Sequence, residues 1–254
     1  MQHLKWLWVS TMFSFKPVFC LLMASAVLTA CVTPGPAPQN TPVSAPFDLH
    51  GPQAMRFQRV VARMEPVAER MCQSRTRDGV NCDYKIVLDE RPNAPSNAYQ
   101  SQDPSGRPVL TFTATILADF QNDDELAFVL GHEAAHHIGG HIAQTRQTAT
   151  VGALLGGAAA LLLGGGDTAV DIGVDLGGSV GARAFSKDHE LEADALGARI
   201  TLAAGYDAVR GAAFFQRIPD PGDRFLGSHP PNAQRIETVR QAVRQTVRQP
   251  GAGL

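Results

Sequence analysis

The sequence feature that most constrains the fold is His132-Glu133-Ala134-Ala135-His136, two histidines four residues apart in an apolar segment. This spacing is about one turn of an α-helix, so both imidazoles project from the same face. Asn122 precedes the segment, and Glu125 follows Asn122 by three residues, which is typical of a capping box at a helix start. The next apolar positions form a buried face: Leu126, Val129 and Leu130. We therefore expect a helix that opens at Asn122 and continues to about Thr145.

Two imidazoles in this arrangement can bind one Zn²⁺ ion through their ring nitrogens. Glu133 lies beside the first histidine and can accept a proton from a water on the metal. Zinc lowers the pKa of such a water towards ~7 and polarises a carbonyl group. A nucleophile, a Lewis acid and a general base are what peptide-bond hydrolysis requires. His132, Glu133 and His136 therefore predict a zinc-dependent peptidase with one Zn²⁺ per chain.

A catalytic zinc site needs a third protein ligand. One class of these sites uses a histidine ten residues after the first, but Ile142 stands there and His141 is one residue early. A slip of one residue rotates a side chain by about 100° around a helix. Downstream, Glu190 and Asp194 share a helical face, so Glu190 can complete a two-His, one-Glu set and Asp194 can orient a ligand imidazole. Glu192 points about 200° away from Glu190 and is expected to lie outside the site.

The stretch from Glu125 to His136, together with Ser186 to Asp194, resembles the zinc endopeptidase family of gluzincin type that includes HtpX and the CaaX prenyl proteases. The periplasmic lipoprotein branch of that family is the most similar kind. The resemblance runs from about Gln53 to Gln245. It implies a mostly helical, zincin-like metalloprotease domain in which Glu190 is the third zinc ligand.

Two further segments share the resemblance. Asn97-Ala98-Tyr99 is similar to a strand that edges the family's cleft, which implies an edge that could bind an extended peptide by strand addition. Ser228-His229-Pro230-Pro231 is similar to a late His-Pro segment, which implies that His229 lies near the metal. There it could hydrogen-bond the developing oxyanion or occupy the open position of zinc; a loop histidine before a proline-capped helix is the alternative. Arg235 is expected to pair with a carboxylate near the cleft, whereas His137 and His141 are expected to be structural or exposed.

The elements around the histidine helix predict an α+β fold, mostly helical, with a small β-sheet ahead of that helix. Residues 52–74 have helical periodicity, and Pro66 is expected to kink or divide this helix. Three strand candidates follow, at residues 84–89, 97–101 and 109–113. Strands and helices do not alternate as they do in parallel α/β folds. Residues 232–248 have the apolar stripe of an amphipathic helix.

Residues 151–182 are apolar and rich in small residues, and Gly164-Gly165-Gly166 interrupts them. The glycines on either side have a spacing that permits close contact between helices. We expect a hairpin of two tightly packed helices that covers the domain. The alternative is a mobile flap that touches lipid or substrate.

Residues 1–30 have the order of a secretory signal, with Lys5 and Lys16 ahead of an apolar run, residues 17–30, that is too short to span a membrane. The run ends in Leu28-Thr29-Ala30-Cys31, which resembles the lipobox of bacterial lipoproteins and implies cleavage before Cys31 and lipid on that residue. Val32 follows instead of Asp, which favours the outer membrane by analogy, with the domain facing the periplasm. Residues 31–50 are rich in proline and predict a tether, and residues 51–249 are expected to form the metallopeptidase domain.

Cys72 and Cys82 remain once Cys31 and the signal segment are set aside. In an oxidising periplasm, two cysteines this close in sequence favour a disulfide, with two free thiols as the alternative.

These features predict a membrane-anchored endopeptidase that acts on unfolded or misassembled proteins of the bacterial cell envelope, as part of protein quality control. The outer-membrane assembly machinery is a candidate partner. The net charge of -2 and the lack of a basic field argue against nucleic acid. The rival hypothesis is a non-catalytic, zinc-stabilised chaperone or assembly factor for outer-membrane proteins. Glu133 beside a three-ligand site favours the enzyme, because structural zinc sites usually have four protein ligands.

Overall fold

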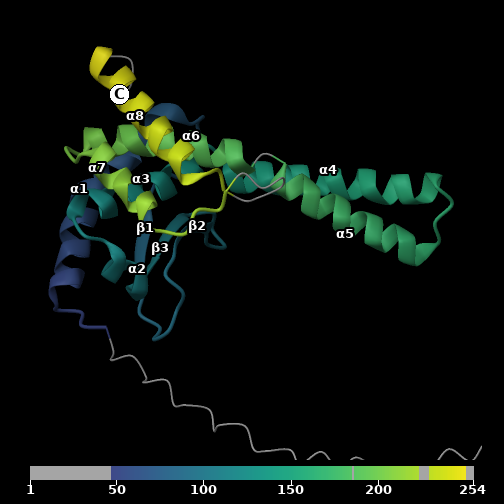
Figure 1. The fold of residues 1–254 in the computed structure, drawn as a ribbon, viewed down its shortest axis with the longest axis horizontal. Helices are drawn as coiled ribbons and strands as arrows, with labels where there is room; N and C mark the ends of the chain where they lie inside the picture. Colours follow the sequence, from purple (N-terminus) through teal and green to yellow (C-terminus); the bar gives the residue numbers. More distant parts are fainter. Residues whose placement is uncertain (1–46, 185, 223–228, 250–254) are drawn as a thin grey trace, which may run out of the picture. The chain divides into compact units, whose positions relative to one another are not determined.

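The computed structural model describes residues 47–184, 186–222 and 229–249 (Figure 1). The chain divides into two units, Met1–Thr41 and Pro42–Leu254, and the structure described below belongs to the second. The expected signal segment, the lipidated Cys31 and the tether up to residue 46 lie outside the described residues, and so does Ser228.

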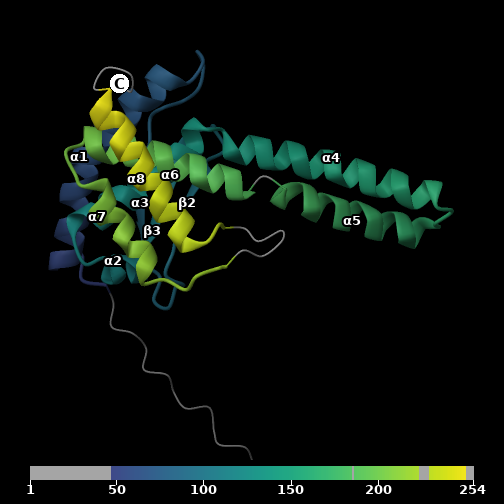
Figure 2. The same ribbon diagram turned by 45° about the horizontal axis from the view of Figure 1, so that its top comes forward.

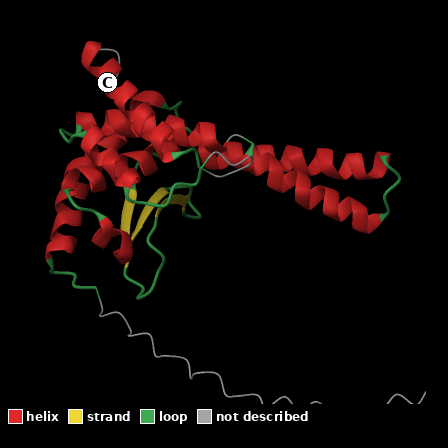
Figure 3. Ribbon diagram, viewed as in Figure 1, coloured by secondary structure: helices red, strands yellow, loops and turns green. Residues whose placement is uncertain are grey.

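Three short strands form one sheet, which is drawn in yellow in Figure 3. β3 (Pro108–Thr113) is central, with β1 (Lys85–Asp89) parallel to it on one side and β2 (Ala98–Gln102) antiparallel on the other. Within the described residues β2 pairs with β3 alone, so β2 is an edge of the sheet. The strands lie within one residue of their expected positions, and the predicted α+β class is confirmed.

The first helix, α1 (Pro52–Arg75), packs one apolar face on the domain core. Pro66 lies inside this helix, which continues on both sides of it, so the expectation of a division was wrong. Proline removes one helical hydrogen bond, but the residues that flank Pro66 on the packed face, Met64 and Ala68, are both buried. Burial of that face stabilises the helix across the missing bond.

A disulfide joins Cys72, near the end of α1, to Cys82 in the loop before β1. Their Cα atoms are 5.7 Å apart, within the usual range for this bond. Both residues are buried in the core, so the bond fixes the loop to the helix that precedes it.

The histidine-bearing helix, α3, occupies the centre of the domain (Figures 1 and 2). It contacts strands β2 and β3 and helices α1, α4, α6 and α7, and most of its residues are buried. α3 runs from Asp123 to Ile138. The domain also contains α2 (Ala114–Asp119), α6 (Ser186–Ala203), α7 (Ala208–Ala212), the 3₁₀ turn η1 (Ala213–Gln216) and α8 (Asn232–Arg248). Burial of most of the helix explains why its sequence is apolar around most of its circumference.

The expected continuation of this helix to Thr145 was wrong. α3 ends at Ile138, and a new helix, α4 (His141–Leu162), begins after Gly139 and Gly140. Gly140 has φ 67°, a left-handed conformation that glycine adopts without steric cost and that commonly terminates helices. The chain therefore changes direction between His136 and His141. Because these residues lie on different helices, their relative orientation does not follow from their spacing in sequence.

α4 and α5 (Asp167–Arg183) lie side by side as a helical hairpin. Their backbones touch through glycines: a Cβ atom on Gly152 or Gly156 would meet the backbone of α5. The hairpin does not cover the domain as expected, because it projects away from the other helices (Figures 1 and 2). Its outer leucines are exposed, with Leu162 and Leu163 at 89% and 88%. Within the described residues, no helix combines the length and the hydrophobicity needed to cross a membrane.

Candidate metal centre and active site

The contact between α3 and α6 brings the two predicted motifs together. Gly131 and Gly197 face each other, and a Cβ atom on Gly197 would lie 2.8 Å from the backbone nitrogen of His132. The Thr201 hydroxyl donates to the Gly197 carbonyl at 2.7 Å, inside the same contact. Glycine at both positions therefore allows the two backbones to approach closely, next to the residues that carry the polar site.

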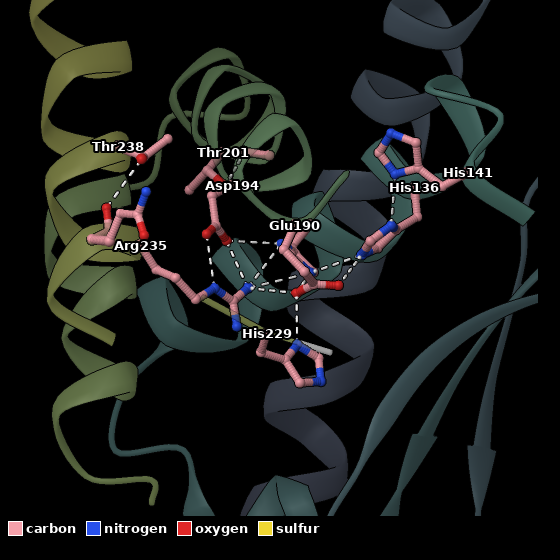
Figure 4. A network of polar contacts seen from close by, with 11 residues as sticks. His136, His141, Glu190, Asp194, Thr201, His229, Arg235 and Thr238 are labelled. Carbon is pink, nitrogen blue, oxygen red and sulfur yellow. Dashed lines mark hydrogen bonds and ion pairs between the residues drawn. The ribbon is translucent and has the colours of Figure 1, made fainter. Parts of the chain in front are cut away.

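Three of the predicted ligands converge, as Figure 4 shows for His136 and Glu190. The Nε2 atoms of His132 and His136 are 3.0 Å apart. Glu190 places Oε1 3.3 Å from Nε2 of His136 and Oε2 3.5 Å from Nε2 of His132. One ligand atom from each residue lies within 4.8 Å of the others. In the part of the chain that the structure describes, this is the one cluster of His, Cys, Asp and Glu with such spacing.

The donor set fits a zinc ion. Nδ1 of His132 lies 2.9 Å from Oδ1 of Asp194 and can donate to it, which leaves the lone pair of Nε2 directed at the cluster. Oε2 of Glu190 is buried, and no donor in the described residues meets hydrogen-bond geometry towards it, although Nδ1 of His229 lies 3.0 Å away. Two imidazole nitrogens and a buried carboxylate oxygen with unused bonding capacity are a ligand set that zinc accepts.

Electrostatics favour a positive charge at the same point. Burial lowers the pKa of His132, but the carboxylates of Asp194 and Glu190 outweigh burial and raise that pKa to about 10. Burial raises the pKa of Glu190, but the adjacent imidazoles of His132 and His136 hold it well below its usual range. The buried carboxylates thus remain ionised, and a divalent cation can supply the charge that balances them.

Asp194 and Arg235 form a buried pair behind the first histidine. Nε and Nη2 of Arg235 donate to the two carboxylate oxygens of Asp194, each at 2.8 Å, and Nη2 also lies 3.3 Å from Oε2 of Glu190. The guanidinium packs over the ring of Phe215, 3.8 Å from its centroid. Burial raises the pKa of Asp194, but His132 and Arg235 lower it overall, so this carboxylate stays charged and can hold His132 in place.

Glu133 lies beside the metal-binding side chains and lines a cleft of about 1060 Å³. Its carboxyl group is buried, and burial raises its pKa. A raised pKa makes a glutamate a stronger base, as general-base catalysis near neutral pH requires.

The other predicted site residues lie around this cleft. Asn97, Ala98 and Tyr99 line it from the edge of the sheet. Asn97 exchanges backbone and side-chain hydrogen bonds with Thr113 on β3, so its segment is anchored on the side facing away from the free edge. His229 also lines the cleft and is half exposed.

His141 was expected to be structural or exposed, and its contact with a predicted metal ligand was not foreseen. Its side chain is buried, and its Nδ1 lies 2.8 Å from Nδ1 of His136. Glu192, on the exposed side, has a carboxylate oxygen 3.5 Å from Nε2 of His141. The signal was Gly139-Gly140, which ends the helix and lets the chain bring His141 back towards His136. His137 has a different partner, the carbonyl of Asn81 at 2.7 Å, and contributes to the fold.

The sequence that forms this site also matches a known protein family. The profile of Peptidase family M48 matches residues 54–243, most of the chain. The chain belongs to peptidase family M48. The match includes both motifs of the metal centre and Arg235, so the resemblance inferred from those motifs is confirmed.

Individual relatives support the same enzyme class. A putative beta-barrel assembly-enhancing protease of Vibrio cholerae is 31% identical over 49% of this chain and 28% of its own length. The mitochondrial metalloendopeptidase OMA1 of Saccharomyces cerevisiae is 30% identical over 64% of this chain and 47% of its own. The matched regions cover less than half the length of these relatives. M48 peptidases use zinc, and the yeast relative is named a metalloendopeptidase.

Proposed function

We propose that the protein is a zinc-dependent endopeptidase that hydrolyses unfolded or misassembled proteins of the bacterial cell envelope. The observation that carries the catalytic part is the convergence of His132, His136 and Glu190 beside the carboxyl group of Glu133, at the wall of an open cleft. Three protein ligands leave a coordination position for water or substrate, which is the arrangement of catalytic zinc sites.

His132, His136 and Glu190 would hold the zinc. When bound, zinc supplies a Lewis acid and lowers the pKa of a water molecule. Glu133 takes a proton from the water as its oxygen attacks the carbonyl carbon, and passes that proton to the amide nitrogen as the C–N bond breaks. The products are a carboxylate and an amine.

His229 is proposed to act on the carbonyl oxygen. It lines the same cleft as Glu133, and half of its side chain is exposed to that space. An N–H group at this position can donate a hydrogen bond to the negative charge that develops on the oxygen.

The sheet edge supports an extended polypeptide as the substrate. Residues 97–99 line the cleft at the start of β2, whose outer edge has no strand partner within the described residues. An extended chain can add to such an edge through backbone hydrogen bonds, which are independent of sequence. Only unfolded or loosely folded segments offer their backbone in this way. This is the basis for proposing unfolded proteins as substrates.

The location is proposed from the N-terminal sequence. Lipid on Cys31 and a proline-rich tether would hold the domain at a membrane surface on the periplasmic side of the outer membrane. The name of the Vibrio cholerae relative refers to the assembly of beta-barrels, and that machinery is a candidate partner here.

The test of the catalytic proposal is Glu133→Gln. The variant should bind one zinc per chain, as wild type does, and lose cleavage of an unfolded protein by about 10²-fold or more. Metal content by mass spectrometry and cleavage of a reduced, alkylated protein measure the two properties separately. Retained cleavage would overturn the mechanism. Envelope proteins that accumulate in a Glu133→Gln strain would identify substrates, whereas an unaltered strain would favour the chaperone alternative.

The test of the location is Cys31→Ser. We expect wild type to sediment with outer membranes and the variant to be found in the soluble fraction. Membrane association of the variant equal to that of wild type would contradict lipid anchoring at this residue.

A further inference from the structure

We propose that His141 is the positioning residue of the second zinc ligand, accepting the Nδ1–H proton of His136 so that Nε2 of His136 presents its lone pair to the metal. This inference rests on the proposed metal centre and adds a residue to it. His141 is the first residue of α4, five positions beyond His136.

The hydrogen bond fixes one tautomer. Nε2 of His136 faces Glu190 and His132, while its Nδ1 faces Nδ1 of His141 at 2.8 Å. If Nε2 holds the metal, the proton of the neutral ring is on Nδ1, and His141 must then be the acceptor. Nδ1 of His141 is consequently unprotonated, and its own proton is on Nε2, directed towards the carboxylate of Glu192 at 3.5 Å.

The surroundings of His141 hold its ring in this orientation. The ring stacks on His189, with centroids 4.4 Å apart and planes 10° from parallel. Nε2 of His189 in turn lies 3.1 Å from Oε1 of Gln144, one turn further along α4. On another side the ring lies against Gly139, where a Cβ atom would lie 2.8 Å from Cδ2 of His141. The acceptor atom is therefore held by packing before any metal binds.

The two histidine ligands thus have different partners. His132 donates to the carboxylate of Asp194, which is itself neutralised by Arg235, whereas His136 donates to an imidazole. Each partner fixes a ring orientation, and loss of such a partner typically lowers metal affinity by about 10- to 100-fold. His141 performs this task without placing another buried negative charge beside the metal.

Two nearly isosteric variants test the inference. His141→Asn places an amide oxygen close to the position of Nδ1 and keeps an acceptor, whereas His141→Leu places a methyl group there. We expect the leucine variant to bind zinc about tenfold or more weakly than wild type, and the asparagine variant to remain within about threefold of wild type. Competition with a chromophoric chelator measures affinity, and the visible absorption of the Co²⁺-substituted protein reports ligand geometry.

The readouts are independent of cleavage. Zinc affinity and the Co²⁺ spectrum can both be measured in a Glu133→Gln background, so a failure of the proposed peptidase activity would leave this result unaffected. A leucine variant that binds zinc as tightly as wild type would overturn the role of His141. An asparagine variant as weak as the leucine variant would also overturn it, because the acceptor alone would then not restore binding.

Wild-type protein offers a test that does not depend on how the variants fold. Long-range ¹H–¹⁵N spectra of the zinc-loaded protein should show a protonated Nδ1 on His136 and an unprotonated Nδ1 on His141. A metal-bound Nδ1 on His136, or a proton on Nδ1 of His141, would overturn the assignment.

Discussion

Two pairs of helices in this protein pack closely at glycine residues, but the side chains around the two contacts differ. Between α3 and α6, Gly131 and Gly197 bring the backbones together inside the core, and buried charged side chains gather beside them. Between α4 and α5, glycines such as Gly156 and Gly173 create an even closer contact, but the side chains around it are apolar and many are exposed. Glycine spacing therefore predicts close helix packing, but it does not predict whether a functional site forms beside the contact.

The difference lies in what the rest of the fold adds to each pair. The α3–α6 pair is enclosed by α1, α7 and α8, so its polar groups must find partners within the protein. The hairpin contacts the remaining domain mainly near its base, and its outer residues meet solvent. We expect substitutions in the first pair to affect both stability and metal binding, and those in the second to act locally.

The largest expected effect is on the buried charges of the first pair. Arg235→Met would leave Asp194 buried without its ion-pair partner and should lower the free energy of unfolding by about 3 kcal/mol. Urea denaturation of the zinc-free protein measures this loss. The matched control is Arg183→Met on the exposed surface of α5, which should change stability by less than about 0.5 kcal/mol. Equal losses in both variants would contradict the distinction between the two pairs.

A smaller effect is expected from filling the glycine contact beside the site. Gly197→Ala would place a methyl group 2.8 Å from the backbone nitrogen of His132, so α3 and α6 must move apart. We expect a loss of about 2 kcal/mol in stability and about tenfold in zinc affinity. Chelator competition and thermal unfolding are the measurements. Unchanged zinc affinity would show that the metal centre does not depend on this contact.

The same substitution in the hairpin should leave the metal centre intact. Gly156→Ala would put a methyl group against the backbone of Gly173 and separate α4 from α5 locally. We expect faster hydrogen exchange in α4 and α5, with zinc affinity within about twofold of wild type. A loss of zinc affinity like that of Gly197→Ala would mean that the hairpin is coupled to the metal centre. The two helix pairs would then not differ in their effect on zinc binding.

The smallest effect is expected at the outer end of the hairpin. Leu162 and Leu163 are almost fully exposed, so replacing both with glutamine should change the free energy of unfolding by less than about 0.5 kcal/mol. Chemical denaturation measures it. A clear destabilisation would show that these leucines are buried in solution.

Local signals in the sequence were sufficient to predict most of the helices and strands. The apolar stripe of residues 232–248 predicted α8 with its bounds, and Asn122 caps α3 as expected, accepting from the amide of Glu125 at 3.1 Å. Such signals depend on neighbours within a few positions, which is why they could be interpreted in isolation. The end of α3 was predicted wrongly because the prediction followed the apolar periodicity and gave too little weight to the left-handed conformation that Gly140 adopts.

The site was predictable where a motif fixes spacing, and not where tertiary contacts decide. His132, His136 and Glu190 could be proposed from two short motifs, and the structure brings them together. The acceptor role of His141 could not be predicted, since it depends on a turn at Gly140 and on stacking against His189 from another helix. Likewise, sequence alone suggested a carboxylate partner for Arg235 without identifying Asp194 as that partner.

The ion pair between Asp194 and Arg235 has a consequence for the order of events during synthesis. His132 and His136 leave the ribosome first, Glu190 and Asp194 follow more than fifty residues later, and Arg235 comes about forty residues after those. Before Arg235 has been translated, the Asp194 carboxylate that holds His132 has no guanidinium partner. The order of the segments therefore delays a working peptidase site until nearly the whole domain has been translated.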